Sequence, residues 1–170
     1  MNANPLRYLL FFVVLVLVQV LTLNNVHLFG YASPYLYIWF IILLPYATPR
    51  YLTLFWGFLL GAILDLMNAT PGIHAFATTL AAGVSILALP YFMPHEDERD
   101  RVHIIPSMRS LGIGAFVKYS VLIVFVHHFA LYAIEAFSFN HFFHLFFRVI
   151  VSTLFTLLLI LSLEYFKMKR

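Results

Sequence analysis

Apolar runs long enough to cross a lipid bilayer are the feature of this sequence that most constrains its fold. The chain has 170 residues, of which 63% are hydrophobic and only 10% are charged. A soluble globular domain is about 45–50% apolar and about 25% charged, and a chain of this size has too little interior to hide so much apolar surface. We therefore expect a single membrane domain, 1–170, with lipid as the solvent for most of it.

Six segments have a length and composition suited to a membrane span, which needs about 20 apolar residues. Lipid offers no partner for free backbone N–H and C=O groups, so we predict an all-α integral membrane protein. The second segment is short and lies between Pro34 and Pro49. A cleaved signal peptide is the alternative for the first run, but the run is long and further spanning runs follow, so we expect an uncleaved helix. The predicted helices are about 6–29, 35–47, 51–67, 72–92, 111–134 and 143–166.

Basic residues decide the predicted orientation. Loops that carry Lys or Arg alternate with loops that carry none, and the positive-inside rule then predicts six spans with both termini in the cytoplasm. If the second segment were only re-entrant, five spans would result and the Arg-rich loop 93–110 would lie outside, which the rule disfavours. This loop mixes both signs of charge, typical of a solvated surface or of a docking patch for a cytoplasmic partner. The predicted cytoplasmic anchors are Arg50, Arg99, Arg101, Arg109, Lys167, Lys169 and Arg170.

A carboxylate ends the third apolar run, in the stretch FWGFLLGAILDLMNATPG. Gly57, Gly61 and Asp65 follow one another at spacings of four, so they share one face of a helix. Two small residues at this spacing let another helix approach closely. A carboxylate facing lipid near the bilayer centre would cost up to about 2.5–3.5 kcal/mol. We therefore expect this face to turn away from lipid, toward protein or a water-filled cavity.

Several partners are open to Asp65. It lies about fifteen residues after Arg50, or roughly 22 Å along a helix, which places it in the outer part of the membrane. Backbone N–H groups of the following turn, or of the start of the fourth helix near His74, are one set of partners. Arg148 enters the sixth helix at a similar depth, and depth alone suggests an Asp65–Arg148 ion pair. Three roles stay open: a carboxylate that fixes a turn, a partner or ligand site, and a proton relay.

Chemistry-bearing patterns are few. The chain has no cysteine, and we find no nucleophile–base pair, phosphate-binding glycine loop or metalloprotease motif, so we expect no enzyme, no cofactor and no metal. His127 and His128 are expected to be buried and hydrogen-bonded across helices. His141 and His144 share a face with the cation Arg148, which argues against a metal there. Lys and Arg form no stripe that would suit a nucleic acid.

The stretch PYATPRYLTLFWGFLLGAILDLMNATPGIHAFATTLAAGV resembles the core segment of the rod shape-determining protein MreD family. That family has a proline near the end of its second helix, a third helix ending in G-x-x-x-G-x-x-x-D, and a short turn closing in glycine. A fourth helix rich in small residues follows. The match covers about a quarter of the chain, and the remainder agrees in hydropathy. The residues that carry the resemblance are Pro45, Gly57, Gly61, Asp65, Gly72 and His74.

The resemblance implies a non-catalytic scaffold of the bacterial cell-wall elongation machinery, located in the cytoplasmic membrane. Its implied partners are MreC, a single-span protein, and through it the actin-like MreB and the peptidoglycan synthases. Gly57, Gly61 and Asp65, with Gly72 and His74, would form a helix-packing groove that is either internal or receives the MreC helix. The implied fold is similar to the substrate-binding membrane components of energy-coupling-factor transporters. That similarity gives the alternative, a vitamin-type uptake component, although the first helix lacks the alanine-rich docking face of those proteins.

Overall fold

A computed structural model of the chain describes every residue except 1–4, 26–32, 95–100, 103, 137–141 and 170. In the described part the regular elements are all helices. Four of them are long and apolar enough to cross a membrane: α3 (Arg50–Asn68), α4 (Ile73–Phe92), α7 (Ile113–Ala136) and α8 (Phe142–Lys169). The chain is thus an all-α protein with the build of a multi-pass membrane protein, as its hydropathy predicts.

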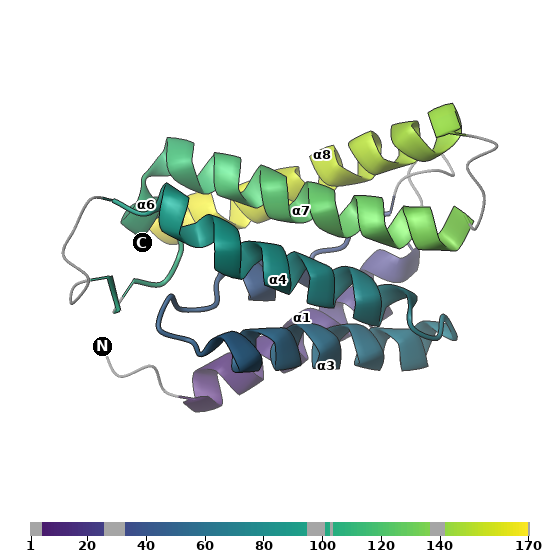
Figure 1. The fold of residues 1–170 in the computed structure, drawn as a ribbon, viewed down its shortest axis with the longest axis horizontal. Helices are drawn as coiled ribbons and strands as arrows, with labels where there is room; N and C mark the ends of the chain where they lie inside the picture. The colour runs from purple at the N-terminus through teal and green to yellow at the C-terminus, as the bar shows by residue number, and fades with distance from the viewer. Residues whose placement is uncertain (1–4, 26–32, 95–100, 103, 137–141, 170) are drawn as a thin grey trace.

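The helices form a bundle around a central segment (Figure 1). α3 packs on α4, α4 on α7, and α7 on α8, while α1 (Pro5–Leu21) packs on α3. The short helix α2 (Ile38–Ile42) contacts α1, α3, α4 and α7. Almost all of segment 33–44 is buried. The chain after α1 therefore runs through the middle of the bundle rather than along its surface.

Two contacts define the two ends of the bundle. At one end Asn24 Nδ2 donates to Asn68 Oδ1 at 2.7 Å, and we call this the asparagine end. At the other, the Tyr46 N–H donates to the carbonyl of Ile104 at 3.0 Å. α1 begins and α8 ends at this second end (Figure 1). It holds Arg50, Arg101, Arg109, Lys167 and Lys169, and we call it the basic end.

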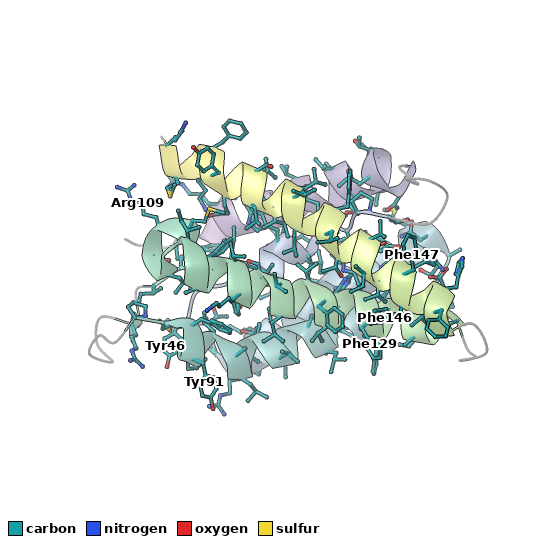
Figure 2. The ribbon with its side chains drawn as sticks, turned by 90° about the horizontal axis from the view of Figure 1, so that it is seen from above. Tyr46, Tyr91, Arg109, Phe129, Phe146 and Phe147 are labelled. Carbon is teal, nitrogen blue, oxygen red and sulfur yellow. The ribbon has the colours of Figure 1, made fainter. Side chains whose placement is uncertain are left out.

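Side chains at the surface follow the same division. Figure 2 shows Tyr46, Tyr91 and Arg109 at the basic end, with Phe129, Phe146 and Phe147 toward the asparagine end. Every predicted cytoplasmic anchor in the described part lies at the basic end. Arg99 and Arg170 are outside the described residues. Grouping of the predicted anchors at one end is the arrangement that the alternation of basic loops implies.

The second predicted helix differs most from the structure. A helix over 35–47 was expected, but α2 has only five residues. Pro34 and Pro45 restrict the backbone on both sides of it. The helix expected over 6–29 also ends early, because α1 stops at Leu21 and a 3-10 turn, η1 (Leu23–Asn25), follows. Residues 26–29 of that prediction lie outside the described residues.

In the described part of the hydrophilic loop 93–110, a short helix, α6 (Met108–Leu111), begins at a Ser107–Ser110 capping box and ends just after the loop. α6 packs on α7 and α8 at the basic end. The described part of the loop is thereby held against the bundle. The Ile104 carbonyl of the loop also accepts the hydrogen bond from the Tyr46 N–H, which lies before α3.

Candidate functional site

The Asp65 carboxylate, which is 6% exposed, caps the start of α4. Its Oδ1 accepts hydrogen bonds from the His74 N–H at 2.9 Å and from Thr70 Oγ1 at 3.0 Å. Its Oδ2 accepts from the Ala75 N–H at 2.9 Å and the Gly72 N–H at 3.1 Å. The first N–H groups of a helix have no partner within the helix, and a negative charge at that end is favourable. The aspartate thus does for α4, from another helix, what an N-cap residue does locally.

The turn between α3 and α4 is shaped to allow this. Ala69 ends α3 in the left-handed conformation with a φ of 54°, and its N–H donates to the Asp65 carbonyl. Gly72 precedes α4 with a φ of 87° and has no side chain with which to cap the helix itself. A Cβ on Gly72 would meet nothing within 4 Å, so glycine is needed there for its backbone conformation rather than for space.

Gly57 and Gly61 lie where α3 and α4 touch. A Cβ on Gly61 would collide with Thr78 Oγ1 and with the backbone of Ala75. A Cβ on Gly57 would stand 2.8 Å from the Cβ of Ala82. The two helices are therefore as close as glycine permits along this face.

The predicted inward face of α3 is confirmed, since Gly57, Gly61 and Asp65 are all buried. The structure also decides between the two roles left open for the groove. α4 occupies it, so the groove is internal to the chain, which is the first of the two roles. Gly72 and His74 belong to the same joint, one in its turn and the other in the first turn of α4.

The predicted Asp65–Arg148 ion pair is not formed. Arg148 lies 3.4 Å from Glu135 and stacks over the ring of Tyr132, with its guanidinium carbon 4.4 Å from the ring centroid. Among the residues that the structure describes, Asp65 has no basic side chain within ion-pair distance. Its four acceptor positions are taken by N–H and O–H donors, so it needs no cation. Glu164, a buried acid near the end of α8, pairs with Lys167 at 2.9 Å.

A second polar constellation surrounds the non-helical segment 33–37. Gln19 of α1 accepts a hydrogen bond from the Leu36 N–H at 2.9 Å and donates to the Pro34 carbonyl at 3.0 Å. Gln19 also donates to Asn24, whose amide reaches Asn68 on α3. One amide side chain thus satisfies two backbone groups that no helix satisfies, as a lipid environment requires.

α8 satisfies the rest of this backbone. The Ser33 N–H donates to Ser152 Oγ at 3.3 Å, and the Tyr35 N–H donates to Thr156 Oγ1 at 3.0 Å. The Tyr132 hydroxyl lies 2.8 Å from the same Ser152 oxygen. No sequence motif pointed to these residues. Their only signal is that small polar side chains interrupt long apolar runs.

Tyr37 joins three elements at the centre of this constellation. Its hydroxyl lies 2.8 Å from His74 Nδ1 on α4 and 2.8 Å from His127 Nε2 on α7. Tyr37 and His127 are fully buried. His128 Nδ1 lies 2.8 Å from the Val124 carbonyl, and its Nε2 is 3.3 Å from Thr156 on α8. The prediction that both histidines are buried and hydrogen-bonded across helices is confirmed.

Among the described residues, five rings pack around Tyr35, with centroids 5.5–6.5 Å from its own. They belong to Tyr37, His74, His127, His128 and Tyr132, and they fill the space between α4, α7 and α8. In the described part of the chain, no three His, Asp or Glu side chains are placed to hold a metal. His141 lies outside that part. The cluster joins 33–37 to three helices through hydrogen bonds and ring contacts, which makes it a structural centre.

Comparison with known proteins finds no matching family model, no similar curated protein and no similar solved structure. The geometry of the residues is therefore the basis for a functional proposal.

Proposed function

We propose that this chain is a non-catalytic scaffold of the bacterial cytoplasmic membrane that supports cell-wall elongation and rod shape, as its resemblance to the MreD family implies. One observation carries the proposal. The residues behind the resemblance form a packed joint between two helices: Gly57 and Gly61 let α4 approach, and Asp65 caps it. Such use of a buried carboxylate suits a rigid frame, because its oxygens are committed to backbone donors.

The scaffold would cross the membrane six times with both termini in the cytoplasm. α1, segment 33–44, α3, α4, α7 and α8 would be the six passes. The second pass contains non-helical backbone, which a membrane protein tolerates only where protein buries it. The side chains of Gln19, Ser152 and Thr156 meet that requirement. The basic end would lie on the cytoplasmic side.

The proposed partner is a single-span protein of the MreC kind, and through it MreB and the peptidoglycan synthases. Because α4 fills the glycine groove, the partner helix would dock elsewhere on the bundle. α1 offers a broad apolar surface for such contact, since Leu6, Leu10 and Leu21 are all well exposed. The proposal thus moves the partner contact away from the face of α3 that the motif occupies.

The alternative, a vitamin-type uptake component, expects a ligand pocket that opens on the outer side. The corresponding region, between segment 33–37, α4, α7 and α8, is filled by Tyr35, Tyr37 and the three imidazoles bonded or packed against them. A ligand could enter only if this cluster were rearranged. Side-chain packing therefore favours the scaffold.

Depletion of the chain in a rod-shaped bacterium that encodes it tests the proposal. We expect the cells to widen and become round, and the chain to co-purify with a single-span coiled-coil protein. Re-expression of the wild type or of Gly83→Ala should restore rods, whereas Gly61→Leu should not, because it breaks the α3–α4 joint. Cells that keep their rod shape after full depletion would contradict the proposal. Rounding that a vitamin supplement reverses would favour the transporter instead.

A further inference from the structure

A cavity of about 300 Å³ lies at the basic end of the bundle, away from the polar centre. Its walls come from the end of the central segment, the loop before α3, the first turn of α3, the last turns of α4 and the first half of α7. Figure 2 places Tyr46, one of its lining residues, at this end. Ligand pockets in proteins begin at about this volume.

The polar part of the cavity favours an anion. Arg50 is the one charged residue among the described residues that line it. The hydroxyl-bearing residues Thr48, Thr53, Ser85 and Tyr119 also line it. The hydroxyls of Thr53 and Ser85 donate to the carbonyls of Pro49 and Ala82, so toward a ligand they are acceptors. The Arg50 guanidinium and the Thr48 hydroxyl are left as the donors for phosphate oxygens. The described lining has no carboxylate that would attract a cationic group.

The other walls are apolar. Ile41, Leu44 and Leu89 line the cavity on the side of the bundle core. Pro90 lies inside α4 and has no N–H, so the carbonyl of Ile86, another lining residue, lacks its helical donor. A ligand that brings its own hydroxyl donor can satisfy such an acceptor. The cavity therefore suits a molecule with a phosphate, a hydroxyl and an apolar portion.

We propose that this cavity binds the headgroup of an anionic phospholipid with a hydroxyl-bearing headgroup, of which phosphatidylglycerol is the simplest example. Its phosphate would meet Arg50, and its glycerol hydroxyls would meet the polar wall. The cavity lies at the end that carries Arg109 and Lys167, where lipid headgroups are expected. Basic pockets between membrane helices on the cytoplasmic side commonly bind such headgroups. This proposal does not depend on the role in wall elongation.

Phosphatidylcholine provides the contrast. Its phosphate has the same charge, but its headgroup ends in a trimethylammonium group with no hydrogen-bond donor. With its phosphate at Arg50, that group would lie against the polar wall, where the described lining has no acid to attract it. The chemistry of the lining therefore predicts discrimination between two lipids that differ only in their headgroups.

Photolabelling in nanodiscs tests the site. The wild type is placed in phosphatidylcholine nanodiscs containing a small fraction of phosphatidylglycerol with a headgroup diazirine, and labelled peptides are identified by mass spectrometry. We expect label on the segments around Arg50 and Ser85. In Arg50→Gln, the mole fraction of phosphatidylglycerol that gives half-maximal labelling should rise about fivefold. Arg7→Gln removes an exposed charge from the same end outside the cavity and should change nothing.

Filling the cavity gives a second measurement. Ser85→Leu should abolish this labelling, and Thr48→Val, at a half-buried loop position, should reduce it in a protein that still folds. Monodispersity on size exclusion verifies folding of each variant. Equal half-maximal fractions for Arg50→Gln and Arg7→Gln would overturn the proposal. So would equal labelling by the matching phosphatidylcholine probe, or label spread evenly over α1. Loss of label to inorganic phosphate, with no competition from unlabelled phosphatidylglycerol, would assign the site to free phosphate and overturn the lipid assignment.

Discussion

The carboxylate of Asp65 on α3 accepts a hydrogen bond from the backbone N–H of Ala75 on α4 at 2.9 Å. A residue at the end of one helix thereby caps the beginning of the next. The bond from the His74 N–H acts in the same way on the other carboxylate oxygen. This joint explains why a lone acid is tolerated at the end of an apolar run, because its charge meets backbone dipoles rather than lipid.

Asp65→Asn should lower the free energy of unfolding by about 2–3 kcal/mol, since hydrogen bonds to a charged group contribute about 1.5–3 kcal/mol. The amide keeps one acceptor oxygen, but its NH₂ group faces N–H donors and leaves them unsatisfied. Unfolding in mixed micelles gives the measurement. Glu135→Gln is the matched control, because it neutralises a more exposed acid at the same end and should cost under about 1 kcal/mol. Equal losses in the two variants would refute the capping role.

Gly61→Ala should destabilise the protein by at least about 2 kcal/mol, because the new methyl group meets the α4 backbone, which cannot move aside. Gly83→Ala is the control within the same hairpin. A Cβ on Gly83 would meet only Leu54 Cδ2, at 3.8 Å, which is ordinary contact. Alanine is also the better helix former, so Gly83→Ala should leave the melting temperature unchanged or raise it. A tolerated Gly61→Ala would show that α3 and α4 are not in close contact.

Exchange of charges between Asp65 and Arg148 should not restore stability. In the double variant Asp65→Arg with Arg148→Asp, the new guanidinium would face the N–H donors of α4. A guanidinium has no acceptor, so it could not accept hydrogen bonds from them. The exchange Glu135→Arg with Arg148→Glu keeps a partly exposed pair and should cost under about 1 kcal/mol. Melting temperatures of both double variants, beside their single variants, decide the matter. Restored stability in the first double variant would show that Asp65 and Arg148 form an ion pair after all.

Tyr37 fixes the tautomers of two buried histidines. Its hydroxyl has one proton but two imidazole neighbours, so one neutral imidazole accepts from it and the other donates to it. Among the described residues His127 Nδ1 has no hydrogen-bond partner, and a bare acceptor is tolerated better than an unsatisfied N–H. We therefore expect His127 to carry its proton on Nε2 and donate to Tyr37, which in turn donates to His74 Nδ1. Nitrogen-15 chemical shifts of labelled histidines report this directly. A proton on His127 Nδ1 would reverse the assignment.

Sequence predicted the inward face of α3 because that inference needs only one helix. The spacing of Gly57, Gly61 and Asp65 places them on one side, and the cost of a charge in lipid turns that side inward. Prediction of the partner of Asp65 also requires knowing which helices pack side by side. Position along a helix is readable from sequence, but lateral position is set by packing. The sequence therefore suggested Asp65 as the partner of Arg148, whereas Arg148 pairs with Glu135.

The central segment was mispredicted for a related reason. Hydropathy identified 35–47 as apolar and therefore as helix, because lipid demands that backbone groups be paired. The pairs come instead from Gln19 and Thr156, which are far away in sequence. Only the assembled bundle provides those acceptors, so local pattern could not anticipate a five-residue helix. A polar residue inside an apolar run was the available signal, and Gln19 is the clearest case.

Single cysteines at the two ends of α3 should label from opposite sides of the membrane. The chain has no cysteine of its own, so each introduced thiol is unique. Ala47 and Pro71 are exposed and flank α3, whose 19 residues extend for about 28 Å, close to the thickness of the hydrocarbon core. With the basic end in the cytoplasm, a membrane-impermeant maleimide should modify Pro71→Cys in intact spheroplasts and Ala47→Cys only after lysis. The reverse labelling pattern would show that the bundle has the opposite orientation, with its basic end outside. Labelling of both from outside would mean that α3 does not span the membrane, and the six-pass topology would fail with it.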